Sequence, residues 1–172
     1  MKTKLLFTLI LIVTFSLTGM AQKNDVNEAT KTISDFKATN SKINKLFDSA
    51  YGYVVLPGIG KGGLGIGGAM GKGTVFKEKK AVADCKMSQI TIGFQLGGQK
   101  YAEVIFFENA DAYDQFVSSK FEFATQVAAV ALDAEIAVPM DYHDGMIVFT
   151  KSLGGLMFEA SVGGQKFKTE MY

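Results

Sequence analysis

The chain has 172 residues, with 18 lysines, 17 acidic residues, one histidine and no arginine, so its net charge is close to zero. A near-neutral chain without arginine lacks the basic stripe that binds nucleic-acid phosphates, and we expect no nucleic-acid partner. The single cysteine, Cys85, cannot form an internal disulfide, so the fold depends on its hydrophobic core.

Residues 1–21 have the three parts of a secretory signal peptide. Lys2 and Lys4 form a charged start, an apolar run extends from Leu5 to Leu17, and Gly19-Met20-Ala21 has the small residues of a cleavage site. The apolar run is shorter than the ~20 residues that a membrane-spanning helix needs. We therefore expect export, cleavage after this segment, and a periplasmic or extracellular protein that can sit peripherally on a membrane.

Two helices are predicted after the signal peptide. Apolar residues recur at helical spacing from Val26 to Phe36 and again from Ile43 to Ala50. Asn40 or Ser41 is the expected N-cap of the second helix. We expect these helices to pack on the domain, and insertion into a membrane interface is the alternative.

A glycine-rich segment dominates the middle of the chain, with nine glycines between Gly58 and Gly73. Tyr53 to Leu56 is predicted as a strand that ends at Pro57, and Thr74 to Phe76 as the next strand. Two G-x-G-x-x-G matches are not followed by a helix, and no P-loop is complete, so nucleotide binding is not expected. The predicted role is tight turns and close backbone packing. The structural glycines are Gly62, Gly63, Gly65, Gly67, Gly68, Gly97 and Gly98.

Hairpins and strands are predicted beyond this segment. Residues 77–80 are a hairpin loop, and apolar alternation from Ile90 indicates a strand that ends at a Gly97-Gly98 turn. The sequence from Leu96 to Tyr101 recurs from Val162 to Phe167, which predicts two similar hairpins with Gly-Gly turns.

The last third of the chain mixes a helix with strands. Asn109 is the expected cap of a helix through Ser119. Residues 121–132 fit either a helix or a buried strand. Further strands are predicted at 146–150, 156–162 and 167–171.

Together these elements predict an α+β fold: N-terminal amphipathic helices, then a largely antiparallel, glycine-rich sheet that is curved or forms a partial barrel. The 151 residues after the signal peptide (172 − 21) suit a single domain. Within it, residues 22–49 are the helical region and residues 50–172 the larger part.

No catalytic or metal-binding arrangement is recognisable. A catalytic cysteine needs a nearby base, and the only histidine, His143, lies in a polar turn between Asp141 and Gly145. No acid pair or further set of metal ligands accompanies it. We therefore expect no enzymatic activity, no metal and no cofactor.

Three ordered motifs resemble those of the SYLF domain family. Pro57 to Gly73 has the pattern P-x-x-x-K-G-G-x-G-x-G-G-x-x-G-x-G, residues 93–99 have G-x-Q-x-G-x-Q, and the helix after Asn109 contains A-x-x-x-F. The resemblance covers about residues 46–172. The chain departs from it at FEFA, where relatives have a Trp-bearing turn and a Gly-Ala segment, and at FEAS, where they have a Gly-Leu-Ser-Leu type.

The resemblance implies a lipid-binding module, because members of the family bind phosphoinositides and other anionic lipids, and some eukaryotic members bundle actin. An exported bacterial-type protein does not meet actin or abundant phosphoinositides. The expected partner is therefore anionic phospholipid at a membrane surface. The alternative is a structural or interaction protein of the cell envelope without a lipid ligand.

The lysines are unevenly distributed. Residues 23–86 carry 11 lysines and 6 acidic residues, whereas residues 87–172 carry 5 and 11. Either the N-terminal half forms a basic face, or the fold mixes the two halves. The lysines that we predict to bind lipid are Lys61, Lys72, Lys77, Lys79 and Lys80.

Overall fold

The computed structural model describes residues 26–118, 121–122, 130–131, 141–162 and 164–172. The predicted signal peptide lies outside the described residues. The helices are α1 (Val26–Thr39), α2 (Ser41–Ser49) and α3 (Ala110–Val117). The strands are β1 (Gly52–Lys77), β2 (Lys80–Phe107), β3 (Phe121–Glu122), β4 (Val130–Ala131), β5 (Met146–Val162) and β6 (Gln165–Met171).

One long hairpin forms the centre of the fold. Strands β1 and β2 pair antiparallel from Lys77 opposite Lys80, at the turn, to Gly52 opposite Phe107. Glu78 and Lys79 form the turn with φ of 50° and 64°, the left-handed conformation that two-residue hairpins use. The hairpin loop predicted at 77–80 is confirmed.

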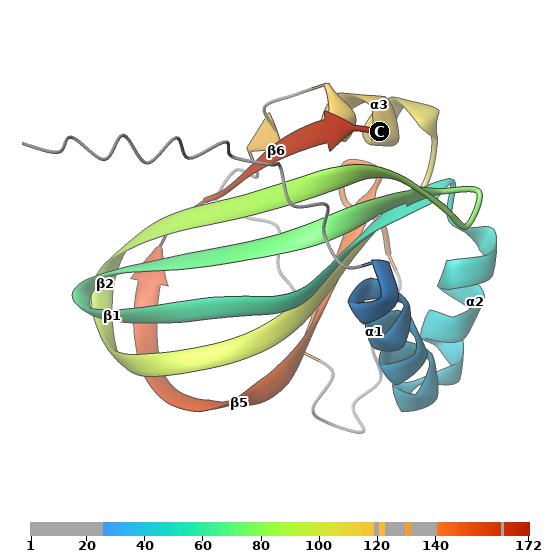
Figure 1. Ribbon diagram of the computed structural model, residues 1–172. Helices are drawn as coiled ribbons and strands as arrows, with labels where there is room; N and C mark the ends of the chain where they lie inside the picture. The colour runs from blue at the N-terminus through green and yellow to red at the C-terminus, as the bar shows by residue number, and fades with distance from the viewer. Residues whose placement is uncertain (1–25, 119–120, 123–129, 132–140, 163) are drawn as a thin grey trace, which may run out of the picture.

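This hairpin folds over at its middle, which we call the corner. Leu64 pairs with Leu96 and Ile66 with Ile92, so Gly65 (φ 73°) lies opposite three residues of β2. Such a bulge bends both strands. Figure 1 shows the bend at the end of the molecule remote from α1 and α2.

The two halves of β1 approach each other closely where glycines replace side chains. A Cβ on Gly71 would lie 2.6 Å from Cγ1 of Ile59. A Cβ on Gly73 would lie 2.8 Å from Cγ of Leu56 and collide with the carbonyl oxygen of Val55. The glycine-rich segment therefore does allow close backbone packing, but the tightest approach is at Gly71 and Gly73.

The glycines predicted to be structural have different surroundings. Gly65 and Gly97 have φ of 73° and 120°, which glycine adopts without strain. A Cβ on Gly68 would lie 3.1 Å from the carbonyl oxygen of Gln89, whereas Gly62 and Gly98 have only ordinary contacts.

Strands β5 and β6 lie one after the other along the edge of β2 that faces away from β1. β5 pairs with Ile92–Phe107, and β6 pairs with Ala83–Gln89. The prediction of two Gly-Gly hairpins is therefore wrong, because Gly97-Gly98 lies within β2 and Gly164 falls between two strands that share one neighbour.

The predicted α+β class is also wrong. The described chain is mostly antiparallel strand with three short helices, and its six-stranded sheet is open rather than a partial barrel. Pro57 and the glycines were expected to interrupt the strands. They form bulges instead, with register shifts after Leu56 and Leu64, and β1 continues through them for 26 residues.

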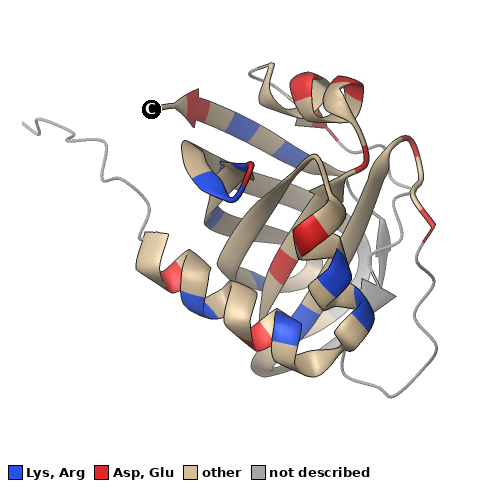
Figure 2. Ribbon diagram, turned by 90° about the vertical axis from the view of Figure 1, so that its right-hand side faces the viewer, with Lys and Arg blue, Asp and Glu red and all other residues tan. Residues whose placement is uncertain are grey.

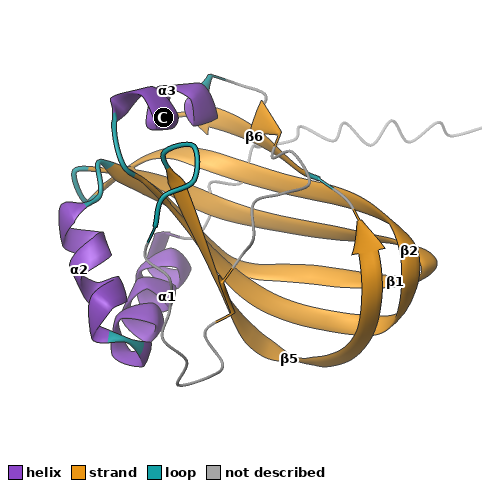
Figure 3. Cartoon of the chain, turned by 180° about the vertical axis from the view of Figure 1, so that it is seen from behind, coloured by secondary structure: helices purple, strands orange, loops and turns teal. Residues whose placement is uncertain are grey.

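Two apolar cores stabilise this sheet. The first lies between the folded halves of the hairpin and includes Leu56, Ile105 and Phe167, with α3 packed against it through Tyr113 and Phe116. The second lies between the sheet and helices α1 and α2 (Figure 3). Its members are Ala29, Phe36, Ile43, Leu46, Phe47, Tyr53, Val55, Phe76, Ala102, Val104, Phe106, Ile147 and Phe149.

The helix predictions are largely confirmed. Asn40 caps α2 by accepting a hydrogen bond from the Lys42 N–H at 2.8 Å, and Asn109 caps α3 by accepting one from the Ala112 N–H at 3.0 Å. Helices α1 and α2 pack on the sheet, as expected. Residues 121–122 and 130–131 are strands, and the rest of the 121–132 segment lies outside the described residues.

Candidate functional site

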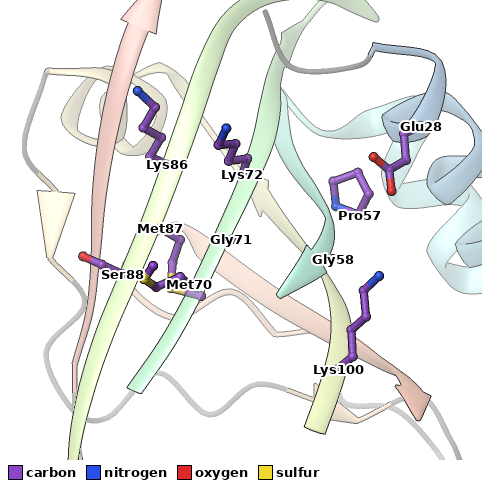
Figure 4. Close-up of a pocket in the computed structure, with 10 residues that line it drawn as sticks. All are labelled: Glu28, Pro57, Gly58, Met70, Gly71, Lys72, Lys86, Met87, Ser88 and Lys100. Atoms are coloured by element: carbon purple, nitrogen blue, oxygen red, sulfur yellow. The ribbon is translucent and has the colours of Figure 1, made fainter. Parts of the chain in front are cut away.

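A cavity of about 500 Å³ opens beside the close approach of the two halves of β1 (Figure 4). Pro57 and Gly58 line one side, and Met70 to Lys72 line the other. The remaining lining residues come from β2 and α1: Lys86, Met87, Ser88, Lys100 and Glu28. This volume is typical of small-molecule sites. We call this cavity the lysine pocket, because three lysines line it.

Two of these lysines face each other across neighbouring strands. Lys72 of β1 is the direct partner of Lys86 of β2, and Lys86 is in turn the partner of Lys168 of β6. Direct partners share a face of the sheet, so three ammonium groups stand in one row. Figure 2 shows β6 with two blue bands before a red band near the C-terminus, where Glu170 forms an ion pair with Lys168 at 3.2 Å.

Like charges placed directly opposite each other destabilise a sheet, so the Lys72–Lys86 pair has a cost that an anion would offset. Within the described residues, none of the ion pairs involves Lys72, Lys86 or Lys100, and Glu170, paired with Lys168, is the carboxylate whose pKa is lowered by Lys168 and also by the charge of Lys86. The row therefore favours the binding of a negatively charged group.

The third lysine approaches from the opposite side of the pocket. Lys100 lies across Gly58, where a Cβ would be 2.9 Å from Lys100 Cε, so the glycine makes room for this side chain. In Figure 4, Lys100 rises beside Gly58 while Lys72 and Lys86 stand across the gap. Glu28 of α1 is the acidic residue at the rim.

The other lining side chains are largely apolar. Met87 is buried, Met70 is exposed, and Pro57 lies across from them. Methionine adapts its shape to irregular apolar groups. Cationic groups beside an apolar surface suit an amphiphilic anion, with the charged part at the lysines.

The structure separates the five predicted lysines into two groups. Lys61 and Lys72 lie on β1, and of the five only Lys72 lines the lysine pocket. Lys77, Lys79 and Lys80 lie at the hairpin turn, away from the corner.

The turn lysines make contacts within the protein. Lys77 Nζ lies 4.9 Å and 5.0 Å from the ring centroids of Tyr51 and Tyr113, and the pKa of Lys77 is raised mainly by hydrogen bonding to Tyr51. Lys79 forms an ion pair with Asp48 at 2.8 Å, which lowers the pKa of that carboxyl. Lys80 is exposed.

Sequence analysis missed Lys86 and Lys100. The predicted hairpin loop at 77–80 was the signal that could have found Lys86. Counting antiparallel pairs outward from that loop places residue 85 opposite Lys72, one residue from the observed partner Lys86. Lys100 lies near Gly58 through the same hairpin register, because its direct partner is Gly60. The bend is what brings Lys72 and Lys86 across from Lys100, and no local pattern reports that bend.

Three further groups lie outside the pocket chemistry, and two of them, Cys85 and Glu103, are buried. Cys85 is buried in the first core, and burial raises the pKa of its thiol to about 12, so it stays protonated and unreactive. Glu103 is fully buried and accepts a hydrogen bond from Gln165 Nε2 at 3.0 Å. His143 lies in a turn where it exchanges backbone hydrogen bonds with Met146, as predicted.

The described residues contain no cluster of His, Cys, Asp and Glu that could hold a metal ion. None of the described helices has the length and apolarity needed to cross a bilayer.

Comparison with curated proteins finds a relative over most of the chain. The chain is 30% identical over 123 residues to a protein named beta cell expansion factor A from Aeromonas veronii. The alignment covers 71% of this chain and 47% of that protein, so the chain spans about half the length of the curated relative it matches. No protein-family model matches the chain.

Proposed function

We propose that this protein is an exported, non-enzymatic module that binds anionic phospholipid at a membrane surface through the lysine pocket. The observation that carries the proposal is the row of lysines at the pocket, where Lys72 and Lys86 face each other. The apolar side chains of Met70 and Met87 beside them suit the lipid part of the same ligand.

We further propose that the chain is a member of the SYLF domain family. Its three motifs occur in the family's order. The structure gives the first of them a physical role, since Gly71 and Gly73 allow the halves of β1 to meet and Lys72, between them, lines the pocket. The lipid ligand of that family agrees with the chemistry of the pocket.

The expected affinity is modest. A lysine close to an anionic membrane contributes about 1 kcal/mol, so three lysines supply about 3 kcal/mol, enough for reversible and salt-sensitive attachment.

The test compares two double variants that remove the same charge. Lys72→Gln with Lys86→Gln changes the pocket, and Lys42→Gln with Lys45→Gln changes exposed lysines of α2. Flotation with vesicles of phosphatidylglycerol and phosphatidylcholine measures binding. We expect the pocket variant to bind roughly thirtyfold more weakly, and the control much less so. An equal loss in both would show that net charge alone matters.

The lysines of the hairpin turn need a separate variant. Replacing Lys77 or Lys79 also removes their contacts with Tyr51 and Asp48, so only Lys80→Gln changes surface charge cleanly. We expect this variant to bind vesicles nearly as well as the parent, and a larger loss would move the lipid site toward the turn.

A further inference from the structure

The corner of the folded hairpin exposes large apolar side chains that no part of the described chain covers. Five of them lie there, each between 52% and 78% exposed: Leu64, Ile66, Ile90, Ile92 and Leu96. We call these five residues the apolar corner. Single exposed apolar residues are ordinary, but several in one place usually mark an interaction surface.

Pairing holds these residues together. Leu64 is the partner of Leu96 and Ile66 of Ile92, so each pair lies on one face across β1 and β2. Ile90 is two residues from Ile92 and therefore points to the same side. The apolar corner lies at the end of the molecule opposite α1 and α2, where it projects from the sheet (Figures 1 and 3).

The charges around the apolar corner are almost all of one sign. Residues 62–71 and 87–99 contain no charged residue. The residues that flank these two stretches are all lysines: Lys61, Lys72, Lys86 and Lys100. We call these four the lysine collar. In β5, the third strand of the bend, the acidic residue is Glu159, whose backbone pairs with that of Gln95.

We infer that the apolar corner inserts into the acyl boundary of an anionic phospholipid bilayer while the lysine collar binds its headgroups. The inference deepens the proposed function and rests on it, since the same membrane supplies both contacts. A cationic ring behind an uncharged apolar tip complements an anionic surface over an apolar interior.

The dimensions agree with this arrangement. A strand rises about 3.3 Å per residue, so Ile90 lies roughly 13 Å along β2 from Lys86, as does Leu96 from Lys100. Interfacial segments insert about 5–10 Å, and the headgroup layer of one leaflet adds roughly 5–7 Å. Lysines of the collar therefore reach the phosphates while the corner contacts the acyl chains. Their long side chains allow this adjustment.

The chain has no tryptophan, so a single introduced tryptophan reports on one site. Ile66→Trp places it in the apolar corner, and Asn44→Trp places it on an exposed position of α2 as the matched control. Each variant is mixed with vesicles of phosphatidylglycerol and phosphatidylcholine, with bromine on the acyl chains as quencher. We expect a blue shift and quenching for Ile66→Trp alone.

A second variant tests the same inference without a probe. Ile66→Ser with Ile92→Ser should weaken vesicle binding at high salt by about tenfold or more, because two apolar side chains no longer leave water on insertion. Its melting temperature should not fall, since both side chains are exposed in the free protein. The Lys72→Gln and Lys86→Gln variant should instead lose the salt-sensitive part of the binding.

The possible outcomes separate the two proposals. Parent protein that binds the vesicles while Ile66→Trp is neither shifted nor quenched overturns the insertion and leaves the proposed function standing. Parent protein that binds no vesicles overturns both. A blue shift without vesicles, together with a dimer in light scattering that the serine variant dissolves, also overturns the insertion, because a second copy then covers the corner.

Discussion

Glu103 is a carboxyl group buried among apolar side chains between the folded halves of the hairpin. Burial raises its pKa from 4.5 to about 7, against the opposing effect of the Gln165 hydrogen bond, and Oε1 has no hydrogen-bond partner. The folded protein thus binds the proton more tightly than the unfolded chain. The stability that protonated Glu103 contributes to the folded protein is fully present below pH 4.5. It is lost as the pH rises through 7, and the free energy of unfolding falls by about 3 kcal/mol in total.

Glu103→Gln removes this ionisation and keeps an oxygen that can accept from Gln165. We expect the variant to be more stable than the parent by about 3 kcal/mol at pH 8 and by little or nothing at pH 4.5. Urea unfolding of both proteins at the two pH values measures the difference, which cancels the titration of all other groups. A difference that does not change with pH would contradict this account of Glu103.

Gly73 tests whether close packing of the halves of β1 shapes the fold. Gly73→Ala introduces a Cβ into contact with the backbone of Val55, and we expect a loss of about 2 kcal/mol or more in the free energy of unfolding. Gly60→Ala is the matched control in the same strand, because a Cβ there has no neighbour within 4 Å. It should leave stability unchanged or raise it by about 0.5 kcal/mol. Equal effects at both positions would contradict the close approach.

At the scale of the elements, the Lys72–Lys86 pair predicts opposite changes in stability and binding. Lys86→Gln removes the repulsion from Lys72 and Lys168, so we expect a gain of about 0.2–1 kcal/mol in the free energy of unfolding at low salt. The same variant should bind anionic vesicles more weakly. Thermal unfolding at low and high salt measures the gain, which should shrink as salt screens the charges. A lower free energy of unfolding for Lys86→Gln would contradict this, because it would show that Lys86 stabilises the fold.

The elements also show how far the sequence predicts this fold. Helices α1, α2 and α3 follow from apolar periodicity and from the caps Asn40 and Asn109, because helical contacts are local. The extent of β1 does not follow, since Pro57 and the glycines have low strand propensity. Pairing with β2 along the whole hairpin overrides that preference, and the bulges absorb the residues that fit poorly.

The lysine pocket follows the same rule. Lys72 could be selected from its place among the glycines, and the register of one hairpin would have added Lys86. That register also places Lys100, the partner of Gly60, beside Gly58, whereas the bend at Gly65 brings Lys72 and Lys86 across from it. The excess of lysines in the N-terminal half did not predict where the pocket lies, because lysines and acidic residues are interspersed on α1 and α2 (Figure 2).

At the scale of the whole molecule, helices α1 and α2 and the apolar corner lie at different ends. Helices α1 and α2 cover the sheet at one end through the second core, and the apolar corner projects from the other. The lysine pocket lies between them, at the seam of β1. Membrane binding in this orientation requires no helix to leave the sheet.

Vesicle binding by the unmodified protein tests the central claim most directly. Flotation would be measured with phosphatidylcholine vesicles that contain increasing phosphatidylglycerol, at low and high salt. We predict binding that rises with the anionic fraction, weakens as salt increases and is much weaker on phosphatidylcholine alone. Equal binding to neutral and anionic vesicles at every salt concentration, or no binding at low salt, would contradict the claim.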